Sequence, residues 1–98
     1  MKLLVVEDES SLLQSIIEYF THEDFFCEGA MSYQQGIDKM EGFQYDCIIL
    51  DINLPGGSGL QLLKHLRQHK KSEGVIIISA RSSLDDKIAG LDLGADDY

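Results

Sequence analysis

Residues 46–57 read DCIILDINLPGG, an apolar run rich in β-branched residues that is closed by proline and glycine. Such a run predicts a short strand buried on both faces, as the central strands of parallel α/β sheets are. Asp51 stands where this strand ends. Because ligands gather outside the carboxyl ends of parallel strands, Asp51 is a candidate reactive or metal-binding acid, although Asp also commonly starts an ordinary turn.

Apolar runs and helical spacings alternate along the rest of the chain. Short apolar runs predict further strands at residues 2–6, 25–28 and 75–79. Serines that suit helix N-termini, followed by apolar residues at helical spacing, predict helices that begin near Ser10, Ser32, Ser58 and Ser83. Their expected inward faces carry Leu12, Leu13, Ile16, Ile17 and Phe20; Tyr33, Ile37 and Met40; Leu60, Leu63 and Leu66; and Leu84, Ile88 and Leu91.

Four strands that alternate with four helices predict βαβ units with right-handed crossovers. We therefore expect an α/β fold of the flavodoxin-like type, a doubly wound parallel sheet with helices on both faces and strand order 2-1-3-4. Residues 1–98 contain no linker, repeat or low-complexity segment, so they are predicted to form one domain.

The composition argues against several kinds of partner. The net charge is −9 and only 8 residues are Lys or Arg, which argues against a nucleic-acid surface because phosphate contacts need clustered cations. No apolar run approaches the ~20 residues that span a bilayer, and the first residues lack the pattern of a signal peptide, so a cytoplasmic protein without membrane contact is expected. Cys27 and Cys47 have no metal-binding spacing and are interpreted as reduced thiols of the core.

Two acidic segments are expected to meet at one edge of the sheet. In the order 2-1-3-4 the first and third strands are neighbours, so Glu7 and Asp8 would lie beside Asp51. Like charges at that range are costly unless they share a cation, and oxygen ligands suit Mg²⁺, so a divalent metal site is predicted. The alternative is that residues 7–9 form a solvated acidic turn that favours the N-terminus of the next helix.

Ser79 ends the fourth predicted strand, on the other side of Asp51. Its hydroxyl could donate a hydrogen bond to charge that develops on Asp51, although a serine at a strand end commonly bonds a nearby backbone group. The three histidines lie within or at the ends of predicted helices and are not expected to be ligands or bases; they are His22, His65 and His69.

Four segments carry the most distinctive motifs of the chain: VVEDE (5–9), ILDINLPGGSG (49–59), ISAR (78–81) and GLDLGADDY (90–98). In this order and spacing they resemble a response-regulator receiver domain, the phosphoacceptor half of two-component signalling. The last two segments are most similar to those of OmpR/PhoB-type regulators, whose receivers precede a winged-helix DNA-binding domain. The resemblance implies a CheY-like fold and a phosphorelay role in transcription regulation.

At the matching positions, the resemblance implies that Asp51 is the phosphoacceptor nucleophile. Asp8 would be the main metal ligand, with Glu7 reaching the Mg²⁺ through water and Asn53 offering its backbone carbonyl. Ser79 would be the switch hydroxyl. The donor in the family is a phosphohistidine on a sensor histidine kinase or a small acyl phosphate. The chain would therefore be no enzyme in the usual sense, because it would catalyse only its own phosphorylation and dephosphorylation.

Receivers of this family continue into a fifth strand with a Lys-Pro pair and a fifth helix, and the sequence ends at Tyr98 without them. We therefore expect the domain to be C-terminally incomplete, with weak phosphorylation of Asp51. We also expect self-association or homodimerisation through an exposed fourth strand at residues 75–79. DNA contact is expected only through a domain absent from this chain.

Three other interpretations compete with this one. A haloacid-dehalogenase-type phosphatase would need a second titratable acid where Asn53 stands. A flavodoxin-like cofactor module would need a first loop that binds phosphate, and the acids of residues 7–9 would repel one. A degenerate receiver that acts only as a protein-interaction or dimerisation module stays open.

Overall fold

The computed structural model describes residues 1–68 and 74–78. Its elements, in chain order, are β1 (Lys2–Val6), α1 (Ser10–His22), β2 (Phe26–Ala30), α2 (Tyr33–Gly42), β3 (Cys47–Asp51), β4 (Asn53–Leu54), β5 (Gly57–Ser58), α3 (Gly59–Gln68) and β6 (Gly74–Ile78). The predicted helix after Ser83 and the predicted strand-end residue Ser79 lie outside the described residues.

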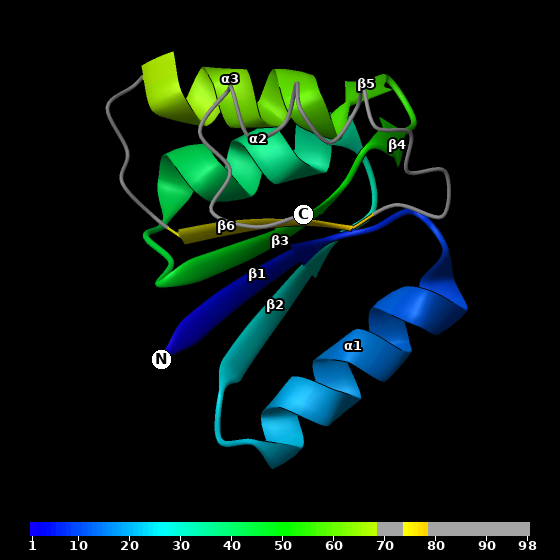
Figure 1. Ribbon diagram of the computed structural model, residues 1–98, viewed down its shortest axis with the longest axis vertical. Coiled ribbons are helices and arrows are strands. Elements are labelled where there is room, and N and C mark those ends of the chain that lie inside the picture. The colour runs from blue at the N-terminus through cyan, green and yellow to red at the C-terminus, as the bar shows by residue number, and fades with distance from the viewer. Residues whose placement is uncertain (69–73, 79–98) are drawn as a thin grey trace.

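Four strands form one parallel sheet in the order β2-β1-β3-β6 (Figure 1). β6 corresponds to the fourth strand predicted from the sequence, so the predicted order 2-1-3-4 is confirmed. In Figure 1, α1 lies on one side of the sheet, and α2 and α3 lie together on the other. The predicted doubly wound α/β fold is therefore confirmed.

The apolar side chains of the strands alternate between the two faces of the sheet. The larger buried cluster fills the space between the sheet and the helices α2 and α3, and it includes Leu4, Leu50 and Leu63. The smaller cluster lies on the α1 side and is built on Leu3, Val5 and Ile49. Both faces of the central strands are thus buried, as the continuous apolar runs predict.

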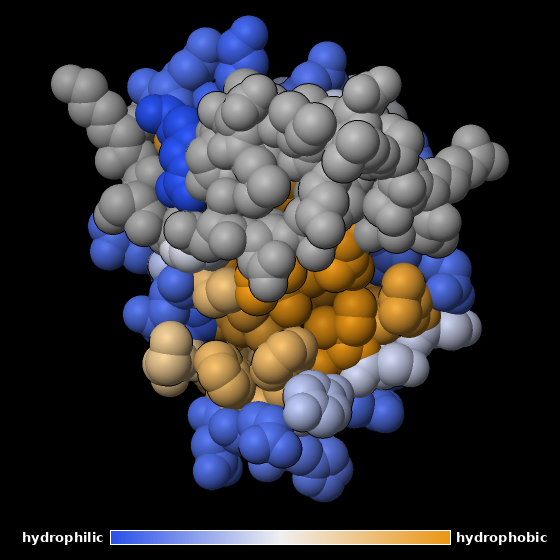
Figure 2. All heavy atoms as spheres, in the orientation of Figure 1, coloured by the Kyte–Doolittle hydropathy of each residue, from blue (hydrophilic) through white to orange (hydrophobic). Residues whose placement is uncertain are grey.

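The α1 side of the sheet is covered less completely. No residue of α1 is fully buried, and Figure 2 shows apolar side chains at the surface between α1 and the strands. Leu12 is 41% exposed, so its predicted place on the inward face is wrong. The rest of the predicted stripe packs on the sheet as half-buried side chains, namely Leu13, Ile16, Ile17 and Phe20.

The start of α1 differs from the prediction. The N-cap is Glu9, and Ser10 is already the first helical residue. The Glu9 carboxylate accepts hydrogen bonds from the backbone N–H groups of Ser11 and Leu12, both at 3.2 Å. Its two oxygens satisfy two free helix amides at once, and its negative charge suits the helix N-terminus.

The second strand is longer than predicted. β2 runs from Phe26 to Ala30, rather than over residues 25–28, because all five of its residues pair with β1. Phe26 is 66% exposed, whereas Phe25 packs edge-on against Phe20 with ring centroids 5.4 Å apart. The bounds of β2 are therefore set by its pairing with β1, and the apolar run alone does not predict them.

The segment between β3 and α3 contains the short antiparallel hairpin of β4 and β5, which the sequence analysis does not predict. Gly56 turns the hairpin with a φ of 83°, a conformation that favours glycine. Ser58 caps the start of α3 as predicted and forms a capping box with Gln61: Ser58 Oγ accepts from the Gln61 N–H at 3.2 Å, and Gln61 Oε1 accepts from the Ser58 N–H at 3.1 Å.

The remaining helix predictions hold in their main features. Ser32 caps α2, and Ile37 and Met40 are buried as predicted. Along α3, Leu62 is buried in addition to the predicted Leu63 and Leu66. Among the described helices, none combines the length and the apolar character that a membrane crossing requires.

Candidate functional site

Three carboxylates meet at the carboxyl ends of β1 and β3. Val6 pairs with Leu50 in the sheet, so the residues that follow them, Glu7 and Asp51, stand at the same level. Oxygen atoms of Glu7, Asp8 and Asp51 all lie within 4.8 Å of one another. The structure therefore brings together three of the residues that the sequence singled out.

Glu7 is the unusual member of this group. It is only 3% exposed, and its Oε2 atom accepts no hydrogen bond. Burial, followed by the hydrogen bond and charge of Asp51 and then by the charge of Asp8, raises the pKa of Glu7 from 4.5 to about 8. Without a cation, Glu7 is thus protonated at neutral pH, and its proton can be donated to Asp51.

Asp51 is presented at the rim of the sheet with one oxygen already engaged. It is the last residue of β3 and is half-buried. The backbone N–H of Asn53 donates to Asp51 Oδ1 at 3.3 Å. This contact orients the carboxylate, while Asp8 is exposed and reachable from solvent.

The three acids fit a hard divalent cation. The cluster offers oxygen ligands only, one ligand is open to water, and the buried Glu7 Oε2 has no protein donor. Mg²⁺ binds through one or two carboxylates and keeps several waters, so this donor set suits it. The alternative of a solvated acidic turn applies to Glu9, which caps α1, but not to the buried Glu7.

The other candidate residues are not part of this cluster. Ser79 and His69 lie outside the described residues. His65 lies on α3, where its Nε2 is 3.3 Å from Glu41 Oε1. Cys27 and Cys47 are half-buried and form no disulfide with each other, and they contribute to the cluster on the α1 side as predicted for core thiols.

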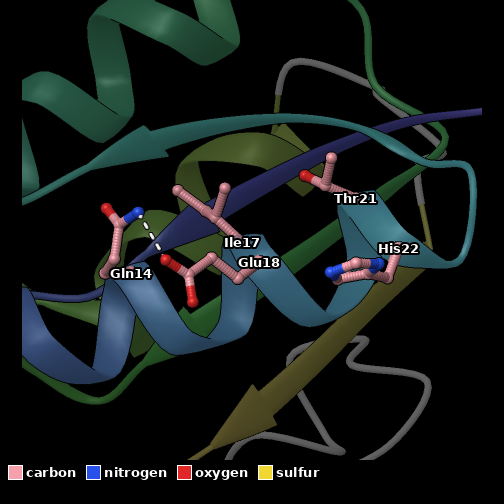
Figure 3. Close-up of a pocket in the computed structure, with 5 residues that line it drawn as sticks. All are labelled: Gln14, Ile17, Glu18, Thr21 and His22. Atoms are coloured by element: carbon pink, nitrogen blue, oxygen red, sulfur yellow. Dashed lines mark hydrogen bonds between the residues drawn. The ribbon is translucent and has the colours of Figure 1, made fainter.

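A hollow on the surface lies along α1 rather than at the acids (Figure 3). Its lining includes Ile17, Thr21 and His22, together with Gln14, whose side chain donates to Glu18 at 3.1 Å. Every lining residue belongs to α1, and no carboxylate of the acidic cluster reaches it. The hollow is therefore separate from the candidate site.

Sequence reasoning found the acids but missed two features of the site. It did not indicate that Glu7 is buried and Asp8 exposed, and it placed the cap of the next helix at Ser10 rather than Glu9. It also missed the β4–β5 hairpin, which holds the Asn53 amide against Asp51. The proline and the two glycines of residues 55–57 were the available signal for a tight turn there.

Comparison with known proteins agrees with this geometry. The profile of the response regulator receiver domain matches residues 3–98. The transcriptional regulatory protein BasR of Escherichia coli is 42% identical over 98 residues, which are all of this chain and 44% of BasR.

Two solved response-regulator structures have the same fold. The receiver domain of the Francisella response regulator 1452 superposes with a TM-score of 0.94 at 34% identity, covering 99% of this chain and 80% of that one. The response regulator TrrA of Thermotoga maritima, solved in complex with Mg²⁺ and BeF, superposes with a TM-score of 0.89 at 30% identity, covering 99% and 83%. The chain therefore belongs to the response-regulator receiver domain family.

Proposed function

We propose that Asp51 accepts a phosphoryl group while Mg²⁺ is held by Asp8 and Asp51, with Glu7 contributing through water and Asn53 through its backbone carbonyl. The observation that carries the proposal is the meeting of three carboxylates at a buried Glu7, to whose Oε2 no protein group donates a hydrogen bond. TrrA supports it, because that relative was solved with Mg²⁺ and a beryllium fluoride.

The chain's own groups account for the transfer. The Asn53 N–H orients Asp51 through Oδ1, and an oxygen of this carboxylate would attack phosphorus. A new O–P bond forms as the bond to the leaving group breaks, and the leaving group departs with its electron pair. When bound, Mg²⁺ neutralises negative charge on the transferred phosphoryl oxygens. Glu7 is protonated near neutral pH, and losing that proton makes its carboxylate available to the cation.

The donor we propose is the phosphohistidine of a sensor histidine kinase, since response regulators act with such kinases. The acceptor is consumed stoichiometrically, so Asp51 phosphorylation is a signal rather than a turnover reaction. Ser79, as the switch hydroxyl, lies outside the described residues, and its role stays a prediction.

BasR, by its name, regulates transcription, and this chain spans less than half of its length. We propose that this receiver likewise acts in transcription regulation of the OmpR/PhoB type, in the cytoplasm. DNA would be contacted by residues beyond this chain, because the net charge of −9 is unfavourable for phosphate contacts.

Intact-protein mass spectrometry tests the central proposal. The chain is incubated with an acyl phosphate and Mg²⁺, and we expect weak uptake of at most one phosphoryl group per molecule. Asp51→Asn should take none, and the matched control Asp38→Asn, which alters an exposed acid of α2, should match the wild type. Equal uptake by Asp51→Asn and wild type would remove Asp51 from the role.

A second role, self-association, is favoured by β6. Within the described sheet β6 is the last strand, and its Ile76 is 36% exposed between the buried Val75 and Ile77. An apolar strand at a sheet edge can pair with a second copy. Light scattering across a concentration series tests this proposal, and a monomer at every concentration would contradict it.

A further inference from the structure

We propose that Tyr33 is a positioning residue for the Asp51 site, acting through the β4–β5 hairpin. The inference rests on the proposed phosphoacceptor function and adds to it a residue of α2. Its starting point is Gly57, a glycine that the backbone does not require. Gly56 has a φ of 83° and needs glycine, whereas the φ of Gly57 is not positive.

The ring of Tyr33 explains the glycine at position 57. A Cβ built on Gly57 would stand 2.6 Å from Cδ2 and 2.7 Å from Cγ of Tyr33, closer than real Cβ atoms come. These ring atoms lie near the Tyr33 backbone, so they cannot move aside as the end of a long side chain can. Tyr33 and Gly57 therefore form a matched pair: the large side chain comes from α2, and the hairpin supplies the space.

A backbone hydrogen bond ties the same two segments together. The N–H of Tyr33 donates to the carbonyl of Pro55 at 3.1 Å. Tyr33 is the first residue of α2, and the first amides of a helix have no acceptor within the helix. The first turn of α2 is held by two further hydrogen bonds. Ser32 Oγ accepts from the Gln35 N–H at 3.1 Å, and Gln35 Oε1 accepts from the Met31 N–H at 2.9 Å. The hairpin tip thus rests on a rigid helix end.

The base of the hairpin holds the reactive acid. The N–H of Gly59 donates to the Ile52 carbonyl at 2.8 Å and closes the base. β4 and β5 are joined by only two residue pairs, and the Asn53 N–H contacts Asp51 Oδ1 at 3.3 Å. A displacement of the tip is therefore passed to Asn53 and to the Asp51 carboxylate. Misplacing a reacting group by about 1 Å can slow a reaction about a hundredfold.

A double-mutant cycle in the 98-residue chain tests the inference. The variants are Tyr33→Ala, Gly57→Ala and the double variant, and the measurement is the Mg²⁺-dependent rate of phosphoryl uptake from an acyl phosphate. We expect phosphoryl uptake to be roughly tenfold slower in each single variant. Tyr33→Ala loosens the hairpin because it removes the ring, and Gly57→Ala pushes the hairpin away from the ring. The double variant should regain part of the rate, since the new methyl group occupies space that the ring leaves, while Gln61 Oε1 still lies 3.1 Å from the added Cβ.

Two controls sharpen the cycle. Tyr33→Phe keeps the ring and should keep the wild-type rate. Gly42→Ala adds a methyl group to α2 where a Cβ meets nothing within 4 Å, and it should also leave the rate unchanged. A rate loss in Tyr33→Phe would assign the effect to the hydroxyl and overturn the packing argument. If circular dichroism shows that Tyr33→Ala is unfolded, Tyr33→Leu takes its place in the cycle.

Amide hydrogen exchange distinguishes failure of this inference from failure of the proposed function, because it requires no phosphorylation. NMR should show faster exchange of the Asn53 and Gly59 amides in both single variants than in the wild type. In the double variant, exchange of these amides should be slower than in either single variant. That pattern supports the inference even if Asp51 takes no phosphoryl group. Unchanged exchange in Tyr33→Ala would overturn it, as would a wild-type rate of uptake in Tyr33→Ala or a double variant that loses the sum of both effects.

Discussion

Replacing Glu7 by Gln tests whether the buried carboxyl is held protonated in the absence of a cation. Gln has the shape of a protonated Glu and can donate the same hydrogen bond to Asp51, but it carries no charge at any pH. The variant should therefore resemble the wild type at low pH and be more stable at high pH. Glu18→Gln, which alters an exposed acid of α1, is the matched control.

The size of the effect follows from the pKa of Glu7, which burial beside Asp51 and Asp8 raises from 4.5 to about 8. The folded protein keeps a proton that the unfolded chain releases above pH 4.5. Each pH unit in this window therefore costs the wild type about 1.36 kcal/mol of stability. The stabilisation is complete below pH 4.5 and lost as the pH rises through about 8, for a total of up to ~5 kcal/mol. Because water can relax around the charged acid, we expect about 2–5 kcal/mol.

Urea unfolding followed by circular dichroism, with EDTA, gives the free energy of unfolding at pH 5, 7 and 9. The gap between Glu7→Gln and wild type should widen with pH, while Glu18→Gln stays within about 0.5 kcal/mol of wild type. Added Mg²⁺ should stabilise the wild type more than Glu7→Gln at pH 9. The reasoning would be refuted if the free energies of unfolding of Glu7→Gln and wild type changed with pH in the same way. It would also be refuted if the wild type were more stable than Glu7→Gln at pH 9 without metal.

Three further predictions concern the scaffold and use the same unfolding assay. Leu63→Ala should cost about 2–5 kcal/mol because Leu63 is fully buried, whereas Leu12→Ala at an exposed position should cost far less; equal losses would contradict the assigned core. Ser32→Ala should cost about 1 kcal/mol because it removes the cap of α2, and no loss would show that the cap contributes nothing. Tyr45→Phe should cost about 1–3 kcal/mol of stability, because the Tyr45 hydroxyl donates a hydrogen bond to Glu28 at 2.8 Å. This bond also lowers the pKa of Glu28, so NMR titration should show a higher Glu28 pKa in the variant. An unchanged Glu28 pKa would contradict the contact.

The order of elements was predictable because it depends on local patterns. The run that ends at Asp51 is apolar enough to be a strand without knowledge of its neighbours, and β3 ends at that residue. The capping pattern of Ser58 and Gln61 likewise acts within one turn. The meeting of the acids required one additional step, the strand order, which short βαβ connections restrict strongly.

The missed features depend on contacts between distant parts of the chain. Tyr33 and Gly57 are separated by the whole of α2 and β3, and no periodicity relates them. The exposure of Phe26, which pairs with Lys2 at the start of β1, is not indicated by the apolar run in which it lies. The burial of Glu7 beside the exposed Asp8 is decided by the tertiary surroundings of each acid, which three consecutive acids in a sequence do not reveal.

Mapping the phosphorylated residue tests the account most directly. After treatment with an acyl phosphate and Mg²⁺, borohydride reduction converts a phosphorylated aspartate into homoserine, which peptide mass spectrometry locates. We predict conversion at Asp51 alone, abolished by EDTA. Conversion at another acid, or labelling that persists without a divalent cation, would contradict the proposal that Glu7, Asp8 and Asp51 form one metal-dependent phosphoacceptor site.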